Sequence, residues 1–141
     1  MNVFDLLKRH ESCRLTPYRD SVGVWTVGWG HNCETTPISQ AVADMMLKDD
    51  AVGVMRQVEA RFAALSFWPA LSDVRQAVCF DVAYNVGVAG FLKFHLMLDA
   101  LERGDYGRAA DELLNSAAAA IDTDRYAELA EMMRRDTWPS A

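Results

Sequence analysis

The sequence predicts an α+β fold that is mostly helical. We expect a small β-hairpin lobe over residues 1–38, a long connecting helix over 39–62 and a helical lobe over 63–141. The apolar pattern alternates around glycines before residue 38 and takes a helical period near residue 39. Helical segments separated by Gly, Pro and Ser follow. A chain of 141 residues has the usual size of one domain, so we expect a single domain over 1–141.

The first predicted element is a helix from Asn2 to Glu11. Asn2 is a favourable N-cap, and Asp5 lies three positions later as a capping-box partner. Spacings of three and four place Phe4, Leu7 and Glu11 on one helical face. A carboxylate at a helix C-terminus gains nothing from the helix dipole. Glu11 is therefore either a solvated residue at a fraying helix end or a functional group.

Two short strands around a glycine turn are predicted next. Leu15–Asp20 forms the first strand and Trp25–His31 the second. Gly28 and Gly30 alternate with large residues, so one face of the second strand would be bare backbone that a ligand can approach closely. A two-stranded ribbon is marginal by itself and must pack on another element.

The connecting helix begins at Ser39, a plausible N-cap, and continues to Phe62 with Gly53 weakening its middle. The next helix has its N-cap at Ser72 and ends in the helix-stop segment 85–90. Further helices are predicted at about 92–103, 106–115 and 124–135, and the run Ala117–Ala120 is compatible with either helix or loop.

The composition excludes several classes of protein. Hydrophobic residues make up 51% of the chain and charged residues 24%, which suits a globular domain with a continuous core. The net charge is −6: residues 1–48 hold five basic and five acidic side chains, whereas residues 49–141 hold nine and fifteen. An acidic surface disfavours nucleic acid and anionic membranes. No apolar run approaches the roughly 18 residues that span a bilayer, so membrane insertion is not expected.

Three cysteines, Cys13, Cys33 and Cys79, are an odd number without a CxxC pair. This pattern argues against a disulfide framework and suits a reducing cytoplasm, as does an N-terminus without the basic and apolar regions of a secretory signal. Cys13 and Cys33 share a region with His10 and His31, but their spacing fits no standard zinc site. We expect a monomer with no metal and no organic cofactor.

Glu11, Asp20 and Thr26 are the candidate chemical residues. Cleaving a glycosidic bond needs one acid to protonate the leaving oxygen and a second carboxylate across the sugar ring. Glu11 ends an apolar stripe, where desolvation favours the protonated acid, and Asp20 borders a polar turn, where it would stay ionised. Spacing alone is a weak signal, because a Glu and an Asp nine positions apart are common.

Three motifs in order make the signal specific. The first is Glu11-x8-Asp20-x5-Thr26 followed by Val27-Gly28-Trp29-Gly30-His31. The second is Arg75-x-Ala77 followed by Asp81-x-x-Tyr84-Asn85-x-Gly87-x-x-Gly90-Phe91, and the third is Arg125, Met132-Met133-Arg134 and Trp138. Together they span almost the whole chain and resemble glycoside hydrolase family 24, which contains the lysozymes of T-even and lambdoid-type phages.

The resemblance implies a lysozyme-like two-lobe fold and an endolysin activity. The substrate would be bacterial peptidoglycan, cleaved with inversion at the β-1,4 bond between N-acetylmuramic acid and N-acetylglucosamine. Glu11 would be the general acid, Asp20 would position or activate the attacking water, and Thr26 would hold that water. Inverting pairs of carboxyl groups lie about 6.5–9.5 Å apart.

The resemblance also assigns binding and structural roles. Asn32, Tyr84, Asn85 and Phe94 fall at or beside positions that contact sugar in relatives, and Glu112 falls at a further one. For Phe94, a core role beside Phe91 and Leu98 fits the helical spacing as well. His31 would form an ion pair with Asp50 on the connecting helix, and this pair would support stability at low pH.

This chain departs from the family at two places. Relatives usually carry a basic residue and a tryptophan after the serine that matches Ser116, whereas this chain has Ala117–Ala120. The segment between His31 and Ser39 is short, which reduces the sheet to a hairpin and a third stub.

Alternative functions are a catalytically silent peptidoglycan-binding module and a lytic transglycosylase, with chitinase activity a weaker option. Retention of Glu11, Asp20 and Thr26 together favours an enzyme over a binding module, and the presence of Asp20 argues against a transglycosylase. As an endolysin, the protein would accumulate in the host cytoplasm and depend on a holin to reach the cell wall.

Overall fold

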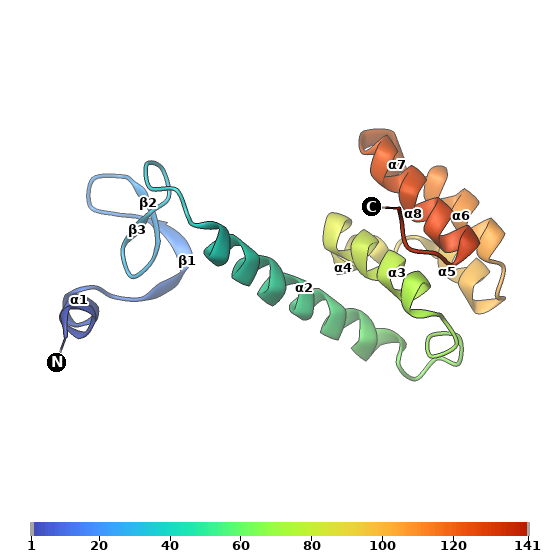
Figure 1. Ribbon diagram of the computed structural model, residues 1–141, viewed down its shortest axis with the longest axis horizontal. Coiled ribbons are helices and arrows are strands. Elements are labelled where there is room, and N and C mark those ends of the chain that lie inside the picture. The colour runs from blue at the N-terminus through green and yellow to red at the C-terminus, as the bar shows by residue number, and fades with distance from the viewer. Residues whose placement is uncertain (1, 141) are drawn as a thin grey trace. The chain divides into compact units, whose positions relative to one another are not determined.

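The computed structural model describes residues 2–140 (Figure 1). In chain order its elements are α1 (Val3–His10), β1 (Arg14–Arg19), β2 (Trp25–Gly28), β3 (His31–Asn32), α2 (Gln40–Phe62), α3 (Asp73–Val86), α4 (Val88–Phe91), α5 (His95–Glu102), α6 (Tyr106–Leu114), α7 (Ala117–Ile121) and α8 (Thr123–Arg135). This is the predicted α+β, mostly helical fold. The chain forms two compact units, residues 1–46 and 47–141, and α2 contributes to both.

The first unit contains α1 and the sheet. The predicted capping box of α1 is present, because Asn2 Oδ1 accepts hydrogen bonds from the Phe4 and Asp5 backbone amides while Asp5 Oδ2 accepts one from the Asn2 backbone N–H. The three strands are antiparallel in the order β1-β2-β3. The third strand is a two-residue stub, as the short segment after His31 predicted.

The second strand is shorter than predicted. It ends at Gly28, and the chain turns before β3 begins at His31. Gly28 and Gly30 have φ angles of 66° and 83°, a region that extended strands do not use and that glycine occupies without a steric penalty. The glycines that suggested a bare strand face therefore form a turn.

Helix α2 begins as predicted, with Ser39 Oγ accepting a hydrogen bond from the Val42 backbone N–H at 3.3 Å. Its last turns bury Val58 and Phe62 in the core of the second unit. Phe62 packs on three aromatic rings, with ring centres 5.7–5.8 Å apart; they belong to Phe67, Trp68 and Phe91. Burial of large aromatic rings anchors this end of α2 in the core.

The remaining helices enclose one apolar core. Helix α8 packs on α3, α6 and α7, and α5 packs on α6 (Figure 1). The largest fully buried side chains of the core are Tyr126, Phe91, Met97, Leu101, Leu113, Met133, Val58, Val78, Val82 and Cys79. The core thus joins residues from the whole span 58–133.

Of two short helices, the first differs from expectation and the second takes one of the two forms that the sequence allowed. Val88–Phe91 lies in the predicted helix-stop segment, yet it forms α4 directly after Gly87, whose φ of 79° breaks the helical path of α3. Ala117–Ile121 forms α7, whose N-cap Ser116 accepts a hydrogen bond from the Ala119 backbone N–H. Within residues 2–140, no helix combines the length and the apolarity that crossing a membrane requires.

Candidate active site

Glu11 is the C-cap of α1, where its backbone turns to an extended conformation and its N–H donates to the Leu7 carbonyl at 2.8 Å. Its carboxylate lies against the backbone of Gly30, since a Cβ atom at position 30 would come within 3.1 Å of Glu11 Oε2. Glu11 is exposed, as are Phe4 and Leu7. The apolar stripe of α1 therefore does not bury this carboxylate, and the desolvation expected from the sequence is not seen among residues 2–46.

Asp20 follows β1 and organises the turn into β2. Its Oδ1 accepts hydrogen bonds from the backbone amides of Val22 and Val24, both at 2.9 Å, and its own N–H donates to the Val24 carbonyl. Gly23, with a φ of 86°, closes the turn. These bonds fix the carboxylate on a short, rigid hairpin and involve only Oδ1.

Thr26 lies on the central strand of the sheet. Its Cα pairs with Tyr18 on β1 and with Asn32 on β3. Thr26 is only 5% exposed, and its Oγ1 donates a hydrogen bond to the Val24 carbonyl at 3.0 Å. With its proton committed, the hydroxyl oxygen can still accept a hydrogen bond, for example from a water molecule.

Asn32 and His31 form the stub β3. Asn32 Oδ1 accepts hydrogen bonds from the backbone amides of Glu34 and Thr35, at 2.9 and 3.0 Å, so its amide NH2 group is the part left for a ligand. His31 Nε2 is buried and has no hydrogen-bond partner among residues 2–140. A buried polar nitrogen without a hydrogen-bond partner costs free energy of folding.

Tyr84 and Asn85 lie in the last turn of α3. Tyr84 is exposed and borders a shallow hollow of about 550 Å³ together with Asp50 and Gln57 of α2. Asn85 is exposed too, but its Oδ1 accepts a hydrogen bond from the hydroxyl of Tyr126 at 3.0 Å. Both side chains are therefore accessible to a ligand, and the amide of Asn85 is held from behind.

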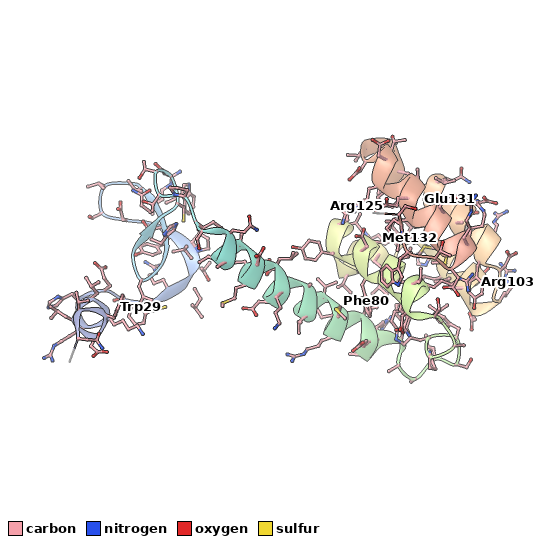
Figure 2. All side chains as sticks on the ribbon, viewed as in Figure 1. Trp29, Phe80, Arg103, Arg125, Glu131 and Met132 are labelled. Atoms are coloured by element: carbon pink, nitrogen blue, oxygen red, sulfur yellow. The ribbon has the colours of Figure 1, made fainter. Side chains whose placement is uncertain are left out.

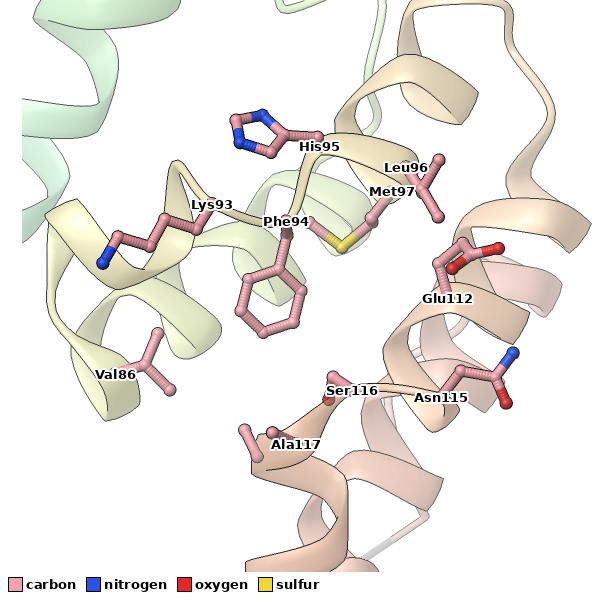
Figure 3. Close-up of a pocket in the computed structure, with 11 residues that line it drawn as sticks. Val86, Lys93, Phe94, His95, Leu96, Met97, Glu112, Asn115, Ser116 and Ala117 are labelled. Carbon is pink, nitrogen blue, oxygen red and sulfur yellow. The ribbon is translucent and has the colours of Figure 1, made fainter.

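Phe94, the N-cap of α5, lines a pocket of about 540 Å³. Figure 3 shows its ring in the space between Val86 and Ser116, with Glu112 and Asn115 on the far side. Phe94 also packs against the core, so both of its sequence-based roles are compatible with its position.

Glu112, on α6, is paired with Arg108 at 2.6 Å, which neutralises its charge at the pocket. Ala117 and Ala118 complete the lining with small side chains. The pocket is mainly apolar.

The predicted site residues fall into two groups. Glu11, Asp20, Thr26, His31 and Asn32 belong to the first compact unit. The candidates from the helical part belong to the second: Asp50, Tyr84, Asn85, Phe94 and Glu112. Among residues 2–140, no group of three or more His, Cys, Asp or Glu side chains is arranged to hold a metal ion.

Two contacts were not predicted from the sequence: Gly30 against Glu11, and Tyr126 behind Asn85. The glycine of the first contact was visible in the motif, but only the three-dimensional turn brings it to the carboxylate. The second contact joins residues 41 positions apart.

Sequence comparisons find phage proteins that are similar to this chain. An endolysin of Acyrthosiphon pisum secondary endosymbiont phage 1 is 28% identical over 123 residues, which cover 85% of this chain and 80% of that protein. The pre-baseplate central spike protein Gp5 of Enterobacteria phage T4 is 25% identical over 134 residues, covering 77% of this chain but 23% of the spike protein. A SAR-endolysin of Enterobacteria phage P21 is 28% identical over 107 residues, covering 73% of this chain and 61% of that protein.

The family profile described as phage lysozyme matches residues 8–135. That span contains every candidate site residue named above, from Glu11 to Glu112. The chain belongs to the phage lysozyme family and is a lysozyme.

Proposed function

We propose that the protein is an endolysin that hydrolyses the β-1,4 bond between N-acetylmuramic acid and N-acetylglucosamine in bacterial peptidoglycan. The observation that carries this proposal is the fixed set of Glu11, Asp20 and Thr26 in one compact unit. One carboxylate lies at a helix end, the other on a hydrogen-bonded hairpin turn, and a buried hydroxyl lies between two flanking strands. Such a set supplies an acid, a second carboxylate and a water-binding group.

In this mechanism Glu11 donates its proton to the glycosidic oxygen. Asp20 is the base: backbone amides hold its Oδ1, and its Oδ2 accepts a proton from water. Thr26 accepts a hydrogen bond from the same water, since its own proton is donated to Val24. Water then attacks from the face opposite the leaving group, which inverts the anomeric carbon.

Saccharide binding is proposed for Asn32, Tyr84, Asn85 and Phe94. Asn32 and Asn85 offer amide NH2 groups, which suit the carbonyl oxygens of N-acetyl groups. Tyr84 and Phe94 offer aromatic faces for sugar rings. The pocket beside Phe94, widened by Ala117 and Ala118, has space for a substituent of the glycan.

The decisive experiment separates hydrolysis from the alternative functions. Purified peptidoglycan should yield reducing-end sugars, detected by mass spectrometry, whereas a lytic transglycosylase would yield anhydro ends. Glu11→Gln, which keeps the size of the side chain but removes the acid, should abolish product formation. If the Glu11→Gln and Asp20→Asn variants both lysed walls as well as the parent protein, the proposed mechanism would be refuted. A protein that binds walls without releasing any sugar would be the silent binding module.

We also propose that His31 and Asp50 form an ion pair. The unpartnered, buried Nε2 of His31 supports this assignment. Attraction between the two side chains would stabilise the fold. Thermal melting of His31→Asn, Asp50→Asn and the double variant tests this. The effects of the two substitutions should be non-additive, and additive effects would contradict the pair.

For access to the wall, we propose accumulation in the host cytoplasm as a monomer, followed by release through a holin. Expression of the chain alone should leave cells intact, and permeabilising the inner membrane should then cause rapid lysis. Lysis without permeabilisation would point instead to secretion of the protein by the cell.

A further inference from the structure

The hydrogen bond between Tyr126 and Asn85 joins a buried residue to an exposed one. Tyr126, on α8, is fully buried, and its hydroxyl lies 3.0 Å from Asn85 Oδ1. Asn85 lies in the last turn of α3, and its side chain is exposed. A buried phenol needs a hydrogen-bond partner, and the Tyr126 hydroxyl donates to Asn85 at the surface.

The bond determines which end of the amide a ligand meets. An asparagine side chain has one acceptor oxygen and an NH2 group with two donors. Because Asn85 Oδ1 receives the Tyr126 proton, rotation of the amide by half a turn would make the hydroxyl an acceptor and leave its buried proton without this acceptor. The NH2 group is therefore held as the part of the side chain that is free to contact a ligand.

The phenol stays a donor over the whole neutral range. Burial raises the pKa of Tyr126 above its ordinary value, and the nearby charge of Arg125 only partly opposes this effect. The neutral hydroxyl can donate, whereas a phenolate could not.

The helices α3 and α8 do not depend on this bond for their contact. One turn before Asn85, Asp81 accepts a hydrogen bond from Arg125 Nε at 2.7 Å (Figure 2 labels Arg125). This pair and the apolar core hold the two helices together. Removing only the Tyr126 hydroxyl should thus free the amide without separating the helices.

We propose that Tyr126 is a positioning residue that fixes Asn85 as a hydrogen-bond donor to a carbonyl oxygen of an N-acetyl sugar. The inference rests on the proposed function, in which Asn85 binds the glycan. Asn32 supports it, because its Oδ1 is likewise bound within the protein and its NH2 group is left over. Each amide held in this way favours ligand groups that accept a hydrogen bond.

The test uses the full chain and a soluble, uncrosslinked glycan of alternating N-acetyl sugars. Asn85→Ala should raise KM about tenfold, and Tyr126→Phe about threefold to fivefold, with kcat within about twofold of the parent. In the Asn85→Ala background, Tyr126→Phe should have no further effect on KM. Asn85→Asp still accepts from Tyr126 but donates nothing, and should match Asn85→Ala.

Tyr106→Phe is the matched control. Its ring also packs against the core, and its hydroxyl has no hydrogen bond in the described part of the chain. It should leave KM unchanged. Melting temperatures of all variants separate loss of stability, which a structural hydroxyl would also cause, from the change in KM.

The outcomes are distinguishable. If Asn85→Ala raises KM but Tyr126→Phe does not, the positioning role is overturned and the proposed function stands. If Asn85→Ala leaves KM unchanged, Asn85 does not bind the glycan and the inference falls with it. If the parent hydrolyses nothing, the proposed hydrolysis fails, and dissociation constants of the same glycan, measured by calorimetry, decide the positioning role in place of KM.

Discussion

Gly30 determines how closely the turn between β2 and β3 approaches the carboxylate of Glu11. Its φ of 83° favours glycine, and a Cβ atom at this position would make a tight contact of 3.1 Å with Glu11 Oε2. Lys8, in the last turn of α1, lies over the ring of the neighbouring Trp29 at 5.6 Å, which also ties the helix end to this turn. The position of the proposed general acid thus depends on a residue with no side chain.

Gly30→Ala should therefore displace the Glu11 carboxylate. A misplacement of about 1 Å at a catalytic group can lower the rate on the order of 100-fold, so we expect kcat to fall by at least tenfold. Gly23→Ala is the control, since Gly23 has nearly the same φ, 86°, but no atom within 4 Å of the added methyl group. Steady-state kinetics on soluble glycan measures both. Equal losses in the two variants would mean that backbone strain, and not contact with Glu11, is responsible.

Because of Cys79, the free energy of unfolding should decrease as pH rises through the alkaline range. The thiol is completely buried in α3, and burial raises its pKa from 9.0 to about 12. Between these values the unfolded chain loses the thiol proton and the folded chain keeps it, so stability falls as pH rises. From pH 9 to pH 10.5 the expected loss is about 2 kcal/mol.

Urea unfolding at pH 8, 9 and 10.5 measures this loss, and Cys79→Ala isolates it. The variant should be less stable at every pH because it leaves a cavity. Its additional loss between pH 9 and pH 10.5 should be smaller than that of the parent by about 2 kcal/mol. Parallel curves for the two proteins would show that Cys79 ionises equally in the folded and unfolded states.

At the scale of elements, Arg75 connects the start of α3 with the end of α8. Its Nε donates to the Met133 carbonyl at 2.9 Å, its Nη1 lies 3.2 Å from Asp136 Oδ2, and its guanidinium lies 3.7 Å from the centre of the Tyr106 ring. Asp136 has a φ of 57°, unusual for a residue with a side chain, and also hydrogen-bonds Ser72, the N-cap of α3. One arginine therefore joins three helices.

Arg75→Met should destabilise the fold by about 2 kcal/mol, because it keeps most of the packing but leaves the Met133 carbonyl without the Arg75 donor and Asp136 with only the Ser72 hydroxyl. Arg103→Met is the control: among residues 2–140 Arg103, the C-cap of α5 (labelled in Figure 2), forms an ion pair only with Asp99 of that helix, and both side chains are exposed. Its cost should stay below about 0.5 kcal/mol. Chemical denaturation gives both values, and similar costs would contradict a bridging role for Arg75.

Elements whose signals are local could be predicted from the sequence. The capping box at Asn2 and the N-caps Ser39 and Ser72 need only residues three positions apart, and all are present. The turn at Gly28–Gly30 was mistaken for a strand because alternation of large and small residues does not report the sign of φ. The helix α4 was missed because its glycines also signal a helix end.

In the candidate site, too, features with local sequence signals could be predicted and tertiary contacts could not. The motifs that resemble the family predict Glu11, Asp20 and Thr26 as candidates, and the hairpin that carries Asp20 follows from Gly23 and the polar turn. The hydrogen bond from Tyr126 to Asn85 could not be predicted, because it depends on how α8 packs on α3. Tertiary packing, unlike capping, leaves no short-range pattern in the sequence.

For the molecule as a whole, the net negative charge does not favour binding to the anionic cell wall that is its proposed substrate. The chain carries a net charge of −6, all of it in excess acidic residues after position 48. Bacterial walls are anionic, so long-range attraction cannot draw this lysozyme to its proposed substrate. Binding must then depend on short-range contacts with the glycan, such as those proposed for the amide and aromatic side chains.

This balance predicts a weak dependence of lysis on salt. Salt screens charges beyond about 8 Å at 0.15 M, so an enzyme steered by attraction loses rate as salt is added, whereas one that is repelled is unaffected or gains. Turbidity clearing of cells stripped of their outer membrane should change by less than tenfold between 10 mM and 0.15 M salt, taken as about a fourfold change in screening length. A larger fall would locate an attractive patch, for which Arg14 and Arg19, held over Tyr18 and Trp25, are the first candidates to neutralise. Those arginines lie on the unit that also carries Glu11 and Asp20, the proposed catalytic carboxylates. Replacing them with neutral residues would therefore separate attraction of the anionic wall to this unit from its repulsion by the acidic second unit.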